Sequence, residues 1–170
     1  MSSDPAPVPE VVQSDALALR PEAPKVWEDV RLQRLWLATQ RREWQSLAIL
    51  PASKSVETLP IAETLAQIAW CYRGQPACVF DLRDLSLRLA EYQIREIRSQ
   101  AEAGARVLVA LRSLAENPTA LLVAKETDAV VLCIALGETE IKAAERVIAD
   151  IGRSRVLGTI LVRARKKGRK

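Results

Sequence analysis

Ala129-Val130-Val131-Leu132-Cys133-Ile134-Ala135-Leu136 is the stretch that decides the fold of this 170-residue chain. It is an almost uninterrupted apolar run, with no alternation between an apolar and a polar face. Runs of this kind are typical of strands that are buried on both faces, as in a parallel sheet. Four further runs share this character and lie at residues 46–50, 77–82, 105–111 and 158–162. The sequence therefore predicts five strands in a mainly parallel sheet.

Helix-forming segments separate these runs and lie at residues 58–72, 84–103, 119–125 and 138–151. Gly74, Gly104 and Gly152 follow three of the segments and are typical helix stop signals. Strands that alternate with helices form right-handed βαβ units. We therefore expect an α/β fold, a three-layer α/β/α sandwich built on a five-stranded sheet.

Composition divides the chain into three parts. Five of the nine prolines lie in residues 1–24, where apolar residues are too few to offset the entropy of ordering. The last eight residues carry six positive side chains, and the chain without them is slightly acidic although its net charge is +4. We predict a disordered arm over residues 1–24, a single domain over 25–163 and a basic tail over 164–170.

Several classes of protein are excluded by what the sequence lacks. There is no histidine, so Ser-His-Asp and Cys-His nucleophiles and imidazole-based metal sites are absent. Cys71, Cys78 and Cys133 form no CxxC pair, which favours free buried thiols in a reducing cytoplasm. No apolar run approaches the roughly 20 residues that span a bilayer, and the N-terminus does not have the pattern of a signal peptide. We expect a soluble, cytoplasmic protein.

A predicted first helix, over residues 25–42, is apolar on two sides. One side carries Val26, Val30, Leu37 and Trp44, and the other carries Leu32, Leu35 and Trp36. A helix that is apolar on two sides needs two partners. We expect the first side to cover the sheet and the second to form an exposed patch for a protein partner.

Specific motifs connect this layout to a known family. Glu28, Arg31 and Arg34 form an E-x-x-R-x-x-R pattern, residues 44–50 have the form of a strand leading into a Walker A loop, and residues 79–83 match a Walker A′ strand. Further matching segments are 61–69, 107–109, 119–122, 127–132 and 155–161. In these features the chain resembles the cytoplasmic ATPase domain of bacterial tyrosine autokinases (BY-kinases) and, more distantly, the MinD/ParA family. The resemblance implies a reduced P-loop NTPase-like fold whose first helix docks onto a neighbouring subunit.

The loop after the first strand departs from the family pattern. Residues 51–59 contain no glycine, whereas a phosphate-binding loop needs glycines so that successive N–H groups face the anion. The Walker A glycines and lysine of the family fall on Ser55, Glu57 and Thr58, and its Mg²⁺-binding hydroxyl falls on Leu59. Glu57 thus places a carboxylate where phosphates would lie, and we expect charge repulsion there.

The other nucleotide motifs are altered as well. Asp81 matches the first Walker A′ aspartate, but Arg83 replaces the second. The third strand ends in residues 110–113, Ala-Leu-Arg-Ser, where the family has Asp-Thr-Pro-Pro, and the base-reading asparagine falls on Val162. The tyrosine cluster is missing, because Tyr72 and Tyr92 are the two tyrosines and both lie in predicted helices. We therefore predict no catalytic, metal-binding or cofactor-binding residue and no small-molecule substrate.

These departures favour a non-catalytic pseudo-ATPase or pseudokinase that acts as an interaction scaffold or regulator. The resemblance implies a partner that is a second copy, a paralogous kinase or a polysaccharide co-polymerase, in exopolysaccharide or capsule production at the inner membrane. The predicted interface consists of Glu28, Arg31, Arg34, Leu32, Leu35 and Trp36.

Two other functions remain open. One is a nucleotide-dependent enzyme with an atypical loop that uses Lys54 and Asp81, although a strand-end ion pair is the simpler role for Asp81. The other is a ParA-like protein that associates with nucleic acid or an anionic membrane surface through the basic tail.

Overall fold

Strand β1 (Ser46–Pro51) is buried at every position and lies at the centre of the sheet. The computed structural model describes residues 28–163, apart from the side chain of Arg73. The predicted arm and basic tail lie outside the described residues. The other elements are α1 (Val30–Thr39), α2 (Leu59–Arg73), β2 (Ala77–Asp81), α3 (Leu87–Glu102), β3 (Arg106–Ala110), α4 (Ala120–Glu126), β4 (Ala129–Leu136), α5 (Ile141–Ile151), the 3₁₀ turn η3 (Arg153–Arg155) and β5 (Val156–Arg163).

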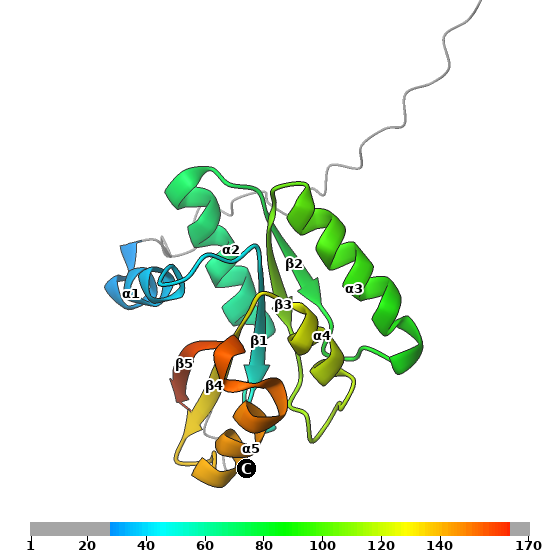
Figure 1. Cartoon of the computed structure of the whole chain (residues 1–170). Coiled ribbons are helices and arrows are strands. Elements are labelled where there is room, and N and C mark those ends of the chain that lie inside the picture. Colours follow the sequence, from blue (N-terminus) through cyan, green and yellow to red (C-terminus); the bar gives the residue numbers. More distant parts are fainter. Residues whose placement is uncertain (1–27, 164–170) are drawn as a thin grey trace, which may run out of the picture.

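All five strands are parallel, in the order β2-β3-β1-β4-β5. The chain runs from β1 to β2 in one direction and makes every later crossover in the opposite direction. Right-handed crossovers therefore place α2 on one face and α3, α4 and α5 on the other, and α1 joins α2 (Figure 1). The fold is the predicted three-layer α/β/α sandwich, and it is consistent with a P-loop-like architecture.

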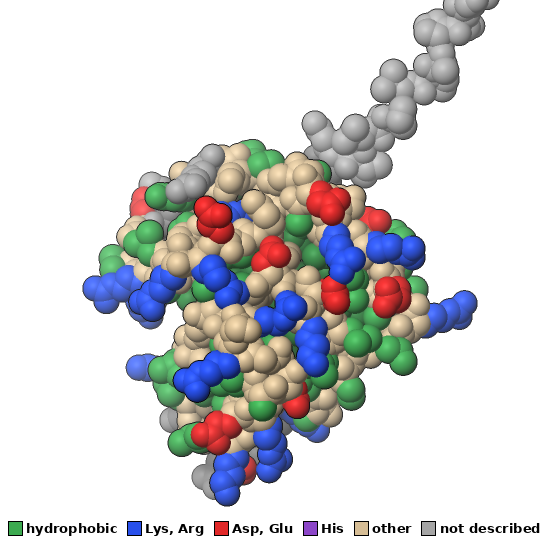
Figure 2. Space-filling model, in the orientation of Figure 1, with side chains coloured by type: hydrophobic (Ala, Val, Ile, Leu, Met, Phe, Trp, Pro, Cys, Tyr) green, Lys and Arg blue, Asp and Glu red, His purple; other side chains and the backbone are tan. Residues whose placement is uncertain are grey.

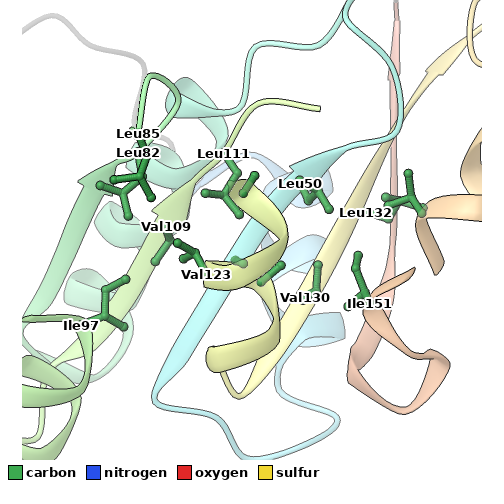
Figure 3. Packing of buried hydrophobic residues seen from close by; sticks show 14 of the residues in the cluster. Leu50, Leu82, Leu85, Ile97, Val109, Leu111, Val123, Val130, Leu132 and Ile151 are labelled. Carbon is green, nitrogen blue, oxygen red and sulfur yellow. The ribbon is translucent and has the colours of Figure 1, made fainter. Parts of the chain in front are cut away.

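The core consists of two apolar layers, one on each face of the sheet. In β3, Val107 and Val109 face the layer under α3 to α5, whereas Leu108 and Ala110 face the layer under α1 and α2. Figure 3 shows the first layer, in which Val123 of α4 and Ile151 of α5 pack towards the strands. Burial on both faces explains why the strand sequences are almost continuously apolar.

The orientation that we predicted for the first helix is wrong. Trp36 is only 3% exposed, and Leu32 and Leu35 pack against the same core layer, whereas Val30 and Leu37 are 55% and 58% exposed. The error arose because the helical wheel included Trp44, but α1 ends at Thr39. Without Trp44 the opposite side has the larger apolar area, so it is the side that is buried.

The cysteines fit the expectation of free thiols only in part. All three are free, but Cys71 is exposed and Cys78 is half-buried, so only Cys133 matches the expected burial. Burial raises the pKa of the Cys133 thiol to about 12, which keeps it protonated and unreactive. Cys71 is exposed because it lies near the end of α2, between the exposed side chains of Trp70 and Tyr72.

Asp128 fastens the amino ends of β1 and β4 together. One of its oxygens, Oδ2, accepts hydrogen bonds from the backbone N–H groups of Gln45 and Ser46, both at 2.8 Å, and from the Ser46 hydroxyl at 3.1 Å. Burial alone raises the pKa of Asp128, but these donors more than offset it and the net shift is downward. The folded state therefore favours the ionised carboxylate.

We expect this carboxylate to make stability depend on pH. Because its folded pKa lies below the unfolded value of about 3.9, its contribution is complete above that value and is lost as the pH falls through the folded pKa. Asp128→Asn should lower the free energy of unfolding at pH 7 by about 1–2 kcal/mol, with a smaller difference at pH 3. Urea unfolding of both proteins at the two pH values measures this, and an equal difference at both would contradict the role of the charge.

Within residues 28–163, no helix has the length and apolar character that crossing a membrane requires.

Candidate functional site

The carboxyl edge of the sheet is where a parallel α/β fold places a ligand crevice. The chain leaves β1 towards α2 on one face, whereas it leaves the neighbouring strands β3 and β4 towards helices on the other face. The loops at residues 52–58, 82–86, 111–119 and 137–140 meet at this edge. They contain most of the positions that the sequence associates with nucleotide chemistry.

The loop after β1 lacks the backbone conformation of a phosphate-binding loop. An anion-binding nest needs residues that alternate between right-handed and left-handed conformations, so that successive N–H groups converge. Among residues 28–163, positive φ occurs at Gly74, Gly104, Gly137 and Gly152 and at no non-glycine residue. The loop over 52–58 therefore contains no left-handed residue and forms no such nest.

Thr58, at the N-cap of α2, points into the protein. Its side chain is fully buried, and its hydroxyl donates a 2.7 Å hydrogen bond to the carbonyl of Leu111, just after β3. Pro60 removes one N–H donor from the first turn of α2, and the N–H of Ile61 is bonded to the Thr58 carbonyl. The Thr58 hydroxyl thus connects the loop after β1 to the loop after β3.

The hydroxyls of the loop after β1 join it to the loop after β4. The Ser53 hydroxyl lies 2.8 Å from the Thr139 hydroxyl and 3.1 Å from that of Ser55. Thr139 in turn accepts a 2.9 Å hydrogen bond from the N–H of Ala135. These bonds join the loops after β1 and β4 at the carboxyl edge.

Arg83 is the central charged residue of the edge. Its Nε and Nη2 atoms form a two-pronged contact with the Asp81 carboxylate at 2.8 and 2.9 Å, and its Nη1 lies 2.8 Å from Glu57. The hydrogen bonds from Arg83 hold the pKa of the Asp81 carboxyl below its usual range. In return, the bonds to Asp81 raise the pKa of the Arg83 guanidinium. One cation therefore pairs with two carboxylates and connects the loops after β1 and β2, and the cluster keeps a net negative charge.

A second set of contacts secures the loop after β3. Arg112 Nε lies 3.0 Å from the Asp84 carboxylate. The Asn117 side chain donates to the carbonyl of Leu85 at 2.9 Å and accepts from the N–H of Thr119 at 3.1 Å. The polar residues of this loop are therefore also engaged in bonds within the protein.

The structure bears differently on each prediction that the sequence made for this edge. The strand-end ion pair of Asp81 is confirmed, and Ser55 and Lys54 are exposed. Glu57 was expected to repel phosphates; Arg83 pairs with it but also pairs with Asp81, so the group keeps a net negative charge and the expected repulsion stays a prediction. The D-x-R spacing at residues 81–83 is a sequence signal for the Asp81–Arg83 pair, whereas no local pattern indicated the contact between Arg83 and Glu57.

The six predicted interface residues lie on or just before α1 and make none of the carboxyl-edge contacts described above. Glu28, Arg31 and Arg34 are exposed, and Arg31 pairs with Asp29, the N-cap residue of α1. Trp36 is buried in its own domain, so it cannot lie at the centre of an exposed interface, and Leu32 and Leu35 are partly covered. Contact of the exposed residues with a partner stays a prediction.

No protein-family model matches this chain, and no curated protein sequence matches it either.

Proposed function

We propose that this chain is a non-catalytic, pseudo-ATPase-like domain that acts through protein contacts as a scaffold or regulator. The observation that carries the proposal is the state of the loop after β1. The loop contains no left-handed residue, and its Thr58 hydroxyl is bonded to the Leu111 carbonyl. A loop in this state offers no converging N–H groups to a nucleotide phosphate, and the hydroxyl at the start of α2 is already bonded within the protein.

The ion pairs of the edge support the same function. Both oxygens of Asp81 are bonded to Arg83, and Glu57 places a further negative charge at the start of α2. A Mg-nucleotide would have to displace Arg83 to reach the Asp81 carboxylate. The alternative of an enzyme that uses Lys54 and Asp81 is therefore the less favoured one.

The proposed setting follows from the resemblance to BY-kinase domains. It comprises exopolysaccharide or capsule production, with a second copy, a paralogous kinase or a co-polymerase at the inner membrane as the partner. The alternative of nucleic-acid or membrane-surface association depends on residues 164–170, which lie outside the described residues. A steep salt dependence of DNA affinity would favour that alternative.

Calorimetry and thermal shift with Mg-ATP and Mg-GTP test the proposal. We expect no stabilisation at millimolar nucleotide, whereas a ligand at 100 times its Kd would add about 2.7 kcal/mol. The proposal would be contradicted by a Mg-dependent rise in melting temperature that is lost in Lys54→Ala. The control Lys125→Ala, at another exposed lysine, should retain such a rise. Light scattering of the full chain, alone and mixed with the paralogous kinase domain, tests the protein contact directly.

A further inference from the structure

Strand β5 forms one edge of the sheet, so one side of its backbone pairs with β4 and the other has no neighbouring strand among residues 28–163 (Figure 1). It is eight residues long, contains no proline and has no charged residue before Arg163. Proteins commonly protect such edges with short strands, prolines, charged residues or β-bulges. An irregularity interrupts the pairing with β4 between Val156 and Gly158, but residues 158–162 pair regularly and have none of these devices. An unprotected edge of this kind is a template for a further strand.

A groove lies on each face of the sheet beside the first half of β5. A groove of about 690 Å³ lies where Ile148 and Ala149 of α5 approach Val156 at the start of β5, and Glu145 and Arg153 also line it. A second groove, of about 370 Å³, lies between α1 and β5 and is lined by Leu35 and Ala38 on one side and by residues 157–160 on the other.

These grooves have a geometry that suits an added strand. Side chains of a strand alternate between the two faces of a sheet, so an added strand beside β5 would send them alternately towards the two grooves. Leu161, which is 62% exposed, would gain an apolar neighbour. The edge therefore offers backbone partners and space for side chains at the same place.

The charges around β5 indicate which kind of strand fits. Arg153 precedes the strand and Arg163 ends it, and both are exposed. Arg41 of the neighbouring segment lines the second groove. Figure 2 shows Lys and Arg side chains over α1 and the adjoining part of the molecule, and also elsewhere on this face. The edge thus has an arginine at each end, and Glu145 of α5 is the acidic residue that lines the first groove beside Arg153.

This arrangement disfavours a second copy of the chain as the occupant. In an antiparallel β5–β5 pair, Arg163 of one copy would lie beside the residue 153–155 turn of the other, which carries two arginines. In a parallel pair, like ends would also meet. Like charges opposite one another destabilise strand pairing, so a partner with acidic ends matches the edge better.

We propose that β5 is the docking edge for an extended segment of a protein partner, with an apolar, β-branched centre and acidic residues at both ends. The segment adds as a sixth strand, and its carboxylates meet Arg153 and Arg163. This inference rests on the proposed function, because it names the surface through which the scaffold contacts its partner.

A synthetic peptide tests the proposal on the full chain. The probe has two glutamates, four threonine–valine repeats and two further glutamates, and carries a fluorophore for anisotropy measurements. We expect it to bind, to bind at least about tenfold more tightly than the same peptide with lysine ends, and to protect the amides of residues 156–163 from hydrogen exchange. A peptide with a central proline should not bind.

Two variants and a control test whether the peptide binds at β5. Leu161→Glu should weaken binding at least about tenfold, whereas Leu89→Glu, at a 51% exposed leucine on α3, should not. The double variant Arg153→Glu/Arg163→Glu should prefer the lysine-ended peptide, which keeps the test valid if Leu161→Glu fails to fold.

Four outcomes would overturn the proposal. Equal binding of both peptides, or protection outside β5, would show that the edge does not select an acidic strand. A wild-type dimer that Leu161→Glu dissolves would assign the edge to a second copy. Peptide binding only after deletion of residues 1–27 would assign it to the chain's own N-terminal segment. The proposed function is tested separately, because nucleotide binding would contradict it. If a protein partner binds the Leu161→Glu variant with unchanged affinity, the docking edge is wrong but the proposed function is not contradicted.

Discussion

Trp36→Ala is expected to lower the free energy of unfolding by about 3–5 kcal/mol, because it leaves a large cavity in a packed core. Trp36 is buried between α1 and the sheet, and its ring meets that of Trp44 edge to face, with centroids 6.1 Å apart. Its indole N–H is buried and no atom of the described residues accepts it, so the loss is one of packing. Urea unfolding at constant pH measures the change.

The control for this prediction lies on the same helix. Leu37→Ala removes an exposed side chain and should change stability by no more than about 0.5 kcal/mol. Trp36→Ala could instead leave stability intact and weaken association with a partner. In that case the side of α1 that carries Leu37 would have to pack on the sheet, and Trp36 would face the partner. That result would restore the orientation that the sequence predicted.

Leu111→Ala should cost about 2–5 kcal/mol, through a cavity directly beneath the carboxyl edge. Leu111 is fully buried among Leu50 and Val109 in the layer that Figure 3 shows. Its backbone also links the loops, because its N–H donates to Ile49 and its carbonyl accepts the Thr58 hydroxyl. We therefore expect faster hydrogen exchange in the loop after β1 as well as a lower melting temperature.

Leu89→Ala is the matched control, because this leucine is exposed on α3 and its truncation opens no cavity. It should leave the melting temperature nearly unchanged. A similar loss of stability in both variants would mean that Leu111 is not part of a tightly packed layer. Normal hydrogen exchange in the loop after β1, despite lower overall stability, would show that the loop does not depend on Leu111.

Much of the fold could be predicted because its signals are local. The apolar run at residues 129–136 is a strand with the predicted limits, and Gly74 and Gly152 directly follow helices, as expected. These signals depend on burial and backbone conformation within a few residues. The five strands and the four helices between them follow from them.

The orientation of α1 and the charge contacts could not be predicted in the same way. The face that α1 buries depends on where the helix ends, and helix ends are the least certain feature of a sequence pattern. Arg83 reaches Glu57 across 26 residues of sequence, although β3 separates β1 from β2 in the sheet. Such a contact depends on strand order, which a local pattern does not contain.

The buried hydroxyl of Thr58 also limits how readily the chain could acquire a phosphate-binding loop. Position 58 is where the family lysine would fall, yet its side chain lies in the interior, so a lysine there would bury a charge and lose the bond to Leu111. Glycines at positions 55 and 57 would leave that obstacle in place. A phosphate-binding loop at this place would therefore need changes in the loop and in the buried contact with Leu111 at the same time.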